Sequence, residues 1–400
     1  MQDIKFEVIK KIADTSFKVR NLSNISNIYS NSPPSVFIGS KLRYPLVNVG
    51  ILSPLERDEN SWLYDDAKYW ANNNFSINDV VKIRESLLNS RFQSKVTDSR
   101  LNKKFVEIAK DIAVASRPVD MEIELKRGLS FEKQKDRVVT PHGIRAGLKK
   151  AKVTSNIKVH RKIDKIVNDE IKASEGIEYL YKNKFNEYSL SKILSVGALG
   201  LKKDKKLVPT RWSITATDDT IGKSLLGKIK DYKWIENYEL SFGEFMGNQY
   251  LILLFPEVFN YELFEIYMPK SSWNPSTEVK ASTDFENFFG RKTYASNTSG
   301  GYYAARLPIL EYLEKIKRQA SVLAIRIETP SYWAALGVWV VRESVRKSME
   351  RKIVFASKQD LVDGAAKIGK IKFNFDCLKI INRSKIMNDV LTQTKLARWF

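Results

Sequence analysis

Cysteine and histidine are almost missing from this chain of 400 residues. The single cysteine, Cys377, excludes an intramolecular disulfide and a zinc cluster held by several thiolates. His142 and His160 are the only two histidines, so neither a multi-histidine metal site nor a cysteine–histidine catalytic pair is expected. No zinc is therefore expected. We interpret Cys377 as a small core residue and His142 as a loop residue.

Long hydrophobic runs are also missing. No stretch of about eighteen apolar residues occurs, which is the length a membrane-spanning helix needs. The segment from Met1 to Lys11 is charged and lacks the apolar centre of a signal peptide. These two absences predict a cytoplasmic protein without a membrane partner.

Acidic residues are too few to balance the basic ones. The chain has 67 Lys and Arg against 46 Asp and Glu, a formal charge of +21, with a pI near 9.6. An excess of this size attracts polyanions through counterion release, which points to DNA as a partner. A hydrophobic fraction of 43% with 11% aromatic residues predicts a folded globular chain.

The spacing of apolar residues predicts an α+β fold. Ser76 followed by Asp79 is typical of a helix-starting capping box. The apolar run Asn248 to Phe255 predicts a strand buried on both faces, while apolar residues spaced three and four apart predict helices over about 159–181 and 307–327. We divide the chain into an N-terminal arm, two folded regions and a tail, at residues 1–31, 32–200, 201–385 and 386–400.

Residues 202–219 carry the densest chemistry. Four lysines precede a segment that alternates with period two from Arg211 onward, which predicts a half-buried strand with Trp212 on the buried face. Its other face would present Arg211 and a row of hydroxyls, which are donors to phosphate oxygens. An ordinary half-exposed strand with solvated lysines is the alternative. The candidate phosphate-binding residues of the chain are Lys202, Lys203, Lys205, Lys206, Thr210, Arg211, Ser213, Thr215, Arg306, Arg342 and Arg346.

Carboxylates at two places suggest a second kind of site. Asp284 and Glu286 lie on alternate positions, so in an extended chain they share a face, and Asp218 or Asp219 would complete a Mg²⁺ or Mn²⁺ site. Solvated acidic residues before a glycine turn are the alternative. With a metal-dependent activity, the candidate catalytic residues are Arg211, Asp218, Asp219, Asp284, Glu286 and Glu343.

Two further segments hold cationic residues near turns or helices. Gly300-Gly301-Tyr302-Tyr303 leads into a helix whose first amides would suit an anion, with Arg306 nearby. The tyrosines would either stack on bases or belong to the core. Arg342 and Arg346, four residues apart, form either a phosphate clamp or a surface ion-pair ladder with Glu343.

The last eight residues read Gln393-Thr-Lys-Leu396-Ala-Arg-Trp399-Phe400. A single helical turn would point Leu396, Trp399 and Phe400 at one surface, with the Gln393 amide at its edge. This pattern resembles the box by which replication and repair proteins bind the sliding clamp, proliferating cell nuclear antigen (PCNA). The alternative is a helix end that packs Leu396 and Trp399 on the chain's own core.

Four internal segments resemble the archaeal Nre family of DNA repair proteins. They are Ser32–Gly39 with Tyr44–Gly50, Leu207–Ala216, Gly300–Arg306 and Gly337–Glu343. The resemblance covers about residues 32–400, includes the C-terminal box, and implies a cytoplasmic archaeal DNA repair protein that binds the clamp. Many relatives carry a cysteine-rich, zinc-finger-like N-terminus, but residues 1–31 contain no cysteine, so a zinc-dependent role does not transfer.

Three functional hypotheses remain open from the sequence. The first is a DNA repair protein that binds DNA through a basic surface and is recruited by PCNA. The second is a metal-dependent nuclease or nucleotide-modifying enzyme of DNA repair. The third is a clamp adaptor without catalytic activity.

Overall fold

The protein is described by a computed structural model that covers residues 25–39, 43–129 and 142–392. These residues form two compact units, one ending at Ile221 and the other beginning at Gly222. The division falls inside helix α8 (Thr210–Ile229), beyond the boundary predicted at residue 200. Each unit combines helices with a mixed sheet, so the predicted α+β class is confirmed.

The first unit contains a sheet of six strands in the order β1-β5-β6-β4-β3-β2. Residues 27–31, which fall in the predicted N-terminal arm, lie in β1 and pair with β5. Only β4 and β6 run parallel to each other among these described pairs. The strands are β1 (Asn27–Ser32), β2 (Val36–Gly39), β3 (Leu46–Ser53), β4 (Leu88–Lys95), β5 (Val119–Leu125) and β6 (Arg145–Val153).

The capping box predicted at Ser76 is confirmed at the start of α3. Ser76 Oγ accepts a hydrogen bond from the Asp79 amide at 3.2 Å, and Asp79 accepts one from the Ser76 amide at 2.9 Å. The single helix predicted over about 159–181 is wrong, because the chain there forms α5 and α6 with an extended break between them. The helices of this unit are η2 (Ser61–Asp65), α2 (Ala67–Asn72), α3 (Ile77–Glu85), η3 (Val96–Arg100), α4 (Lys104–Val114), α5 (Arg161–Asn168), α6 (Ala173–Lys182), α7 (Glu187–Ser195) and the start of α8.

The second unit contains a sheet in the order β10-β9-β11-β8-β7-β12. The predicted strand Asn248–Phe255 is confirmed as β8, and all its residues are buried. The helix predicted over 307–327 is wrong in its second half: the helix ends at Lys317, which has left-handed backbone geometry, and a strand follows. A continuous apolar run contains helix-like spacings by chance when both faces of a strand are buried. The strands are β7 (Tyr238–Phe245), β8, β9 (Asn260–Tyr267), β10 (Lys280–Glu286), β11 (Ser321–Glu328) and β12 (Lys352–Phe355).

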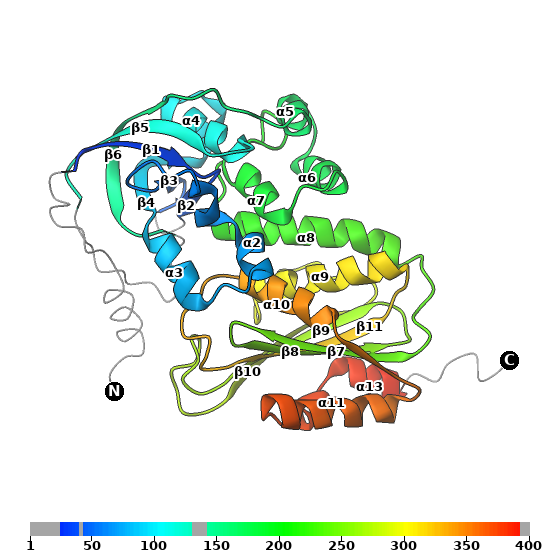
Figure 1. The fold of residues 1–400 in the computed structure, drawn as a ribbon. Helices are drawn as coiled ribbons and strands as arrows, with labels where there is room; N and C mark the ends of the chain where they lie inside the picture. Colours follow the sequence, from blue (N-terminus) through cyan, green and yellow to red (C-terminus); the bar gives the residue numbers. More distant parts are fainter. Residues whose placement is uncertain (1–24, 40–42, 130–141, 393–400) are drawn as a thin grey trace. The chain divides into compact units, whose positions relative to one another are not determined.

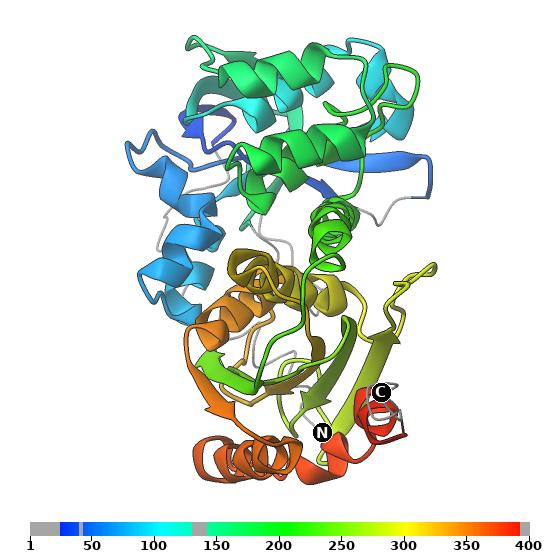
Figure 2. The same ribbon diagram turned by 90° about the vertical axis from the view of Figure 1, so that its right-hand side faces the viewer.

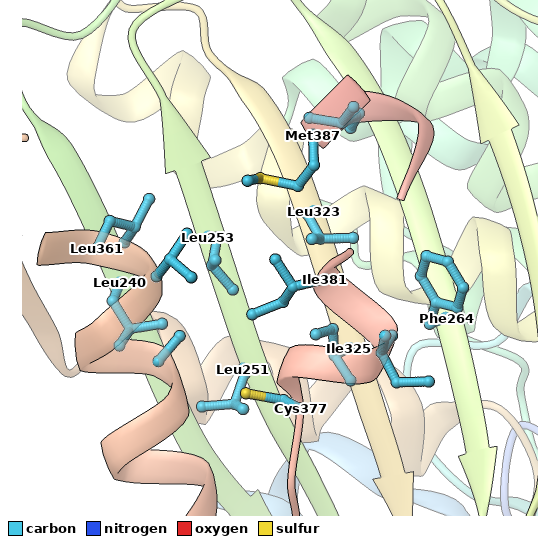
Figure 3. Close-up of a cluster of buried hydrophobic side chains, with 14 of the residues drawn as sticks. Leu240, Leu251, Leu253, Phe264, Leu323, Ile325, Leu361, Cys377, Ile381 and Met387 are labelled. Atoms are coloured by element: carbon cyan, nitrogen blue, oxygen red, sulfur yellow. The ribbon is translucent and has the colours of Figure 1, made fainter. Parts of the chain in front are cut away.

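Helices cover both faces of this second sheet. Figures 1 and 2 show α9 (Gly300–Ile316) and α10 (Trp339–Met349) on one face, with α11 (Lys358–Phe373), α12 (Leu378–Ile381) and α13 (Lys385–Thr392) on the other. The α11–α13 side is apolar: Leu323 and Ile325 of β11 pack with Ile381 and the buried Cys377 (Figure 3). Burial raises the pKa of the Cys377 thiol to about 11, in agreement with its interpretation as a core residue.

The opposite face of the sheet is partly ionic. Successive strand residues point to opposite sides, so Arg326 and Glu328 of β11 face away from the apolar cluster that holds Leu323 and Ile325. These two charged side chains of β11 therefore lie on the α9 side of the sheet. In the described part of the chain, no helix has the length and apolar character needed to cross a membrane.

Candidate functional site

The basic turn, residues Lys202–Lys206, is anchored to the first unit through its backbone. The amides of Asp204 and Lys205 donate to Leu201 O at 2.8 and 3.0 Å, which closes the turn. Arg100 Nε donates to Lys205 O at 2.8 Å. A Cβ on Gly197, whose φ is +68°, would lie 2.5 Å from Lys206 O, so glycine is needed for this close approach. The basic turn is thus an ordered part of the unit.

Three of the four lysines in the basic turn face solvent. Lys202, Lys203 and Lys206 are exposed, and the only ion pair described for them joins Lys202 to Glu170 at 3.8 Å. Lys205 differs: its Nζ donates to Val167 O at 2.8 Å, and burial together with Lys110 lowers its pKa. The exposed cations Arg100, Lys103 and Lys104 belong to the same part of the fold, η3 and the start of α4. Lys205 holds the turn in place, while the charged ends of the other three lysines are exposed to solvent.

The predicted strand from Arg211 to Asp219 is wrong, because these residues form the first half of α8. The amides of Trp212 and Ser213 both donate to Pro209 O, so the helix starts directly after the proline. Short hydroxyl side chains fit this helix because they bond to its own backbone: Ser213 Oγ donates to Thr210 O at 2.9 Å and Thr215 Oγ1 to Arg211 O at 3.3 Å. The alternation of hydroxyl and apolar residues in this segment therefore does not indicate a strand.

Because this segment is a helix, the side chains available for binding differ from those that a strand would present. Thr210 Oγ1 accepts from the Ile38 amide at 2.9 Å, and Ser213 is fully buried, so there is no row of free hydroxyls. Arg211 remains exposed, as the strand interpretation required. Trp212, which the strand interpretation buried, is 59% exposed beside it. Trp212 was missed because its orientation depends on the period assigned to the segment.

The second unit holds Asp284 and Glu286, which do share a face of β10 as predicted, but each is fully occupied by other groups. Asp284 Oδ2 accepts from the Asn297 and Thr298 amides at 3.0 and 2.8 Å, and its Oδ1 lies 3.2 Å from Arg291 Nη1. Both carboxylate oxygens of Glu286 accept from Arg306 Nη1 at 2.9 Å. The two carboxylates are buried ion-pair partners.

Asp218 and Asp219 do not complete a metal site either. They lie next to each other on α8, where Asp218 is buried and Asp219 partly exposed. Within residues 25–39, 43–129 and 142–392, no three His, Cys, Asp or Glu side chains are close enough to hold a metal ion. The described residues therefore offer no support for the predicted Mg²⁺ or Mn²⁺ site.

Arg326 is the centre of a second group of ion pairs, which sequence reasoning missed. Its guanidinium donates to Glu265 at 2.6 Å, to Glu328 at 2.9 Å and to Asn248 Oδ1 at 2.6 and 2.9 Å. Tyr267 donates to the other oxygen of Glu265 at 2.5 Å. Burial raises the pKa of Glu328, although Arg326 favours its charged form. The only signal in the sequence was the presence of charged residues inside otherwise apolar strands.

The start of α9 lies against the carboxylate of Glu265. A Cβ on Gly301 would lie 2.3 Å from Glu265 Oε1, so the glycine allows the helix to approach this side chain. Tyr302 and Tyr303 are buried. The guanidinium carbon of Arg306 lies 5.7 and 5.5 Å from the centroids of their rings. The alternative in which the tyrosines belong to the core is therefore correct, and the segment offers no tyrosine surface for bases.

Of the two alternatives for Arg342 and Arg346, the structure contradicts the phosphate clamp. Arg342 and Glu343 are buried, and Arg346 donates to Glu343 at 2.6 Å and to Glu311 of α9 at 3.0 and 3.1 Å. The ion-pair alternative is correct, with Glu343 buried and both Arg346 and Glu311 partly exposed. Arg306 joins α9 to β10 through Glu286, and Arg346 joins α10 to α9 through Glu311.

The family model described as Archaeal Nre, N-terminal, matches residues 3–274, and the model described as Archaeal Nre, C-terminal, matches residues 286–399. The chain belongs to the archaeal Nre family. Two of the segments that carried the resemblance, Gly300–Arg306 and Gly337–Glu343, form the start of α9 and the start of α10 with the residues before it, and include Arg306 and Glu343 of the ion pairs described above.

Three Nre relatives cover most of the chain. DNA repair protein NreA of Haloferax volcanii is 39% identical over 336 residues, which is 82% of this chain and 80% of the relative. DNA repair protein NreA of Archaeoglobus fulgidus is 40% identical over 344 residues, with 86% and 85% covered. DNA repair protein NreB of the same organism is 32% identical over 363 residues, with 90% and 89% covered. No solved structure gives a significant match.

Proposed function

We propose that this Nre protein acts in DNA repair and binds DNA through the exposed lysines of the basic turn, together with Arg211 and Trp212. The relatives that share most of its length are named DNA repair proteins. The observation that carries the DNA contact is the exposure of Lys202, Lys203 and Lys206 in a chain of charge +21. Lysine, arginine and an exposed indole are the groups that meet phosphates and bases.

The arrangement favours contacts to the DNA backbone. Exposed lysines neutralise phosphates without reading sequence, whereas the guanidinium of Arg211 forms a fixed two-pronged contact. Arg211→Ala should therefore weaken DNA binding more than replacement of any one of the three exposed lysines by glutamine. Fluorescence anisotropy with a labelled duplex measures this order. An equal loss for Arg211→Ala and Lys203→Gln, or a strong preference for one base sequence, would contradict it.

Recruitment by PCNA is the second part of the proposal. It rests on the box Gln393, Leu396, Trp399 and Phe400, which lies outside the described residues. The last described helix, α13, ends at Thr392, and its Ile386 and Met387 pack in the apolar cluster. The residues assigned to the tail therefore begin in the folded body, and the box follows directly after it in the sequence.

Calorimetry with PCNA tests the clamp contact. Changing Trp399 and Phe400 to alanine should abolish binding, because buried aromatic anchors usually carry most of an interface's affinity. Thr394→Ala, at a free position of the box, is the matched control and should bind as the unchanged protein does. Unfolding curves should be the same for all three proteins. Unchanged binding after removal of residues 393–400 would refute this part of the proposal.

A further inference from the structure

The loop between β10 and α9, residues 287–299, presents the most exposed large hydrophobic side chain of the described residues. Phe289 is 86% exposed. Tyr294, five positions further on, is 53% exposed and stacks on the buried Tyr303 with ring centroids 5.6 Å apart and an interplanar angle of 23°. Two aromatic rings of one loop thus face solvent.

Hydrogen bonds within the loop form a turn at Phe289. Asn287 Oδ1 accepts from the Phe289 amide at 3.0 Å, and Asn287 O accepts from the Gly290 amide at 2.8 Å. Gly290 has a φ of +80°, a geometry that favours glycine in a tight turn. No atom lies within 4 Å of the position that a Cβ would take. The ring of Phe289 therefore stands on a structured turn.

Arg291 fixes the other side of the turn. Its guanidinium donates to the carbonyl oxygens of Phe285 at 2.9 Å and Tyr294 at 3.1 Å, and it pairs with the buried Asp284. Because Arg291 is occupied in this way, it ties the exposed rings to the ion pairs beneath α9. An exposed aromatic ring on a fixed turn loses little conformational entropy when it binds a partner.

The only charged side chains of the loop itself are positive. Residues 287–299 contain Arg291 and Lys292 but no aspartate or glutamate. Lys230 Nζ lies 4.8 Å above the ring of Phe288, which itself contacts Phe289 edge to face at 5.8 Å. Protein–protein interface centres are depleted in lysine, whereas sites for unpaired nucleotides combine exposed aromatic rings with lysine and arginine.

We infer that Phe289 is a stacking platform for an unpaired base of DNA, with Lys230 and Lys292 placed to meet the adjoining phosphates. This inference rests on the proposed function, because it assigns to a DNA-binding protein a preference for DNA that contains unpaired bases. Phe289 would contact the flat face of the base, so no base type is specified. The basic turn would contribute equally to paired and unpaired substrates.

Anisotropy with two labelled DNAs tests the inference: a blunt-ended, fully paired duplex and the same duplex with one unpaired thymine. The unchanged protein should bind the second DNA more tightly, and Phe289→Ala should lose that preference through a loss of about 5- to 150-fold on the bulged DNA, the range for one stacked base. Phe289→Trp should keep the preference. Ile371→Ala, which alters another exposed apolar side chain of the same unit, should leave both affinities unchanged.

The outcomes separate the inference from the proposal on which it rests. If the unchanged protein binds neither DNA, the proposed function fails. If it binds both and Phe289→Ala keeps the preference, or weakens both DNAs equally, the stacking inference is refuted while the proposed function stands. If Phe289→Ala instead removes a self-association seen by sedimentation and leaves DNA binding unchanged, the loop serves a second copy of the chain and the inference is also refuted.

Discussion

Arg306 and Glu286 form a buried ion pair in which one guanidinium nitrogen, Nη1, donates to both carboxylate oxygens at 2.9 Å. Both side chains are almost fully buried, with 3% and 0% of their surface exposed. The pair joins α9 to the edge strand β10. Charges in this position stabilise the fold only as a pair, because each alone would be desolvated without compensation.

Glu286→Gln should destabilise the protein by about 3–5 kcal/mol, because Arg306 would remain buried without a carboxylate. The double variant Glu286→Gln/Arg306→Met should recover part of this loss. Chemical denaturation in a double-mutant cycle measures the coupling. Glu170→Gln, which removes the exposed pair with Lys202, is the control and should cost less than about 1 kcal/mol. A cost equally small for Glu286→Gln would contradict the assignment.

Two glycines should respond to alanine in opposite directions. At Gly301 a Cβ would lie 2.3 Å from Glu265 Oε1, whereas at Gly227 nothing lies within 4 Å. Gly301→Ala should therefore lower the thermal midpoint of unfolding, because it forces the start of α9 away from Glu265. Gly227→Ala, on helix α8, should stabilise the protein by about 0.5–1 kcal/mol through helix propensity. Calorimetric scans decide this, and a tolerated Gly301→Ala would show that the approach of α9 is not tight.

The buried carboxyl group of Glu85 should make the stability of the protein depend on pH. It lies at the end of α3 with 9% of its surface exposed, and burial raises its pKa to about 7. Between the unfolded pKa of 4.5 and pH 7 the folded state keeps a proton that the unfolded state releases, so the contribution of Glu85 to stability falls as pH rises. Above pH 7 the deficit is constant.

Glu85→Gln should therefore leave stability unchanged near pH 4 and increase it near pH 8 by up to about 3 kcal/mol. The measurement is urea unfolding of both proteins at the two pH values. Because the comparison is between two proteins at the same pH, the titration of other groups largely cancels. The same difference at both pH values would show that the carboxyl group ionises normally.

Features set by neighbouring residues were predictable from the sequence. The capping box of Ser76 and Asp79 depends on residues three apart, and β8 depends on one apolar run, so both were predicted correctly. The shared face of Asp284 and Glu286 followed from strand geometry alone. Local rules were enough wherever the partner lay within the same element.

The remaining features depended on partners far away in the sequence. Glu286 and Arg306 are 20 positions apart, and Glu265 and Arg326 are 61 positions apart, so no local pattern shows that these charges neutralise each other. An isolated carboxylate in the sequence therefore suggested a metal ligand. The segment after Pro209 failed for a different reason, because alternating hydroxyl and apolar residues also fit a helix whose hydroxyls bond to its own backbone.

The exposed lysines of the basic turn are proposed to bind DNA phosphates. The most direct test is the dependence of DNA affinity on salt for the unchanged protein and for two triple variants, each with three lysines changed to glutamine. One variant alters Lys202, Lys203 and Lys206, and leaves Lys205 to hold the turn. The other, a control for net charge, alters the exposed Lys367, Lys370 and Lys372 of α11.

The logarithm of affinity should fall linearly with the logarithm of salt concentration, by about 0.9 for each neutralised phosphate. Loss of Lys202, Lys203 and Lys206 should flatten this slope by about two to three units, and loss of the three α11 lysines should leave it unchanged. An affinity independent of salt, or the same slope in all three proteins, would show that these lysines do not bind DNA phosphates.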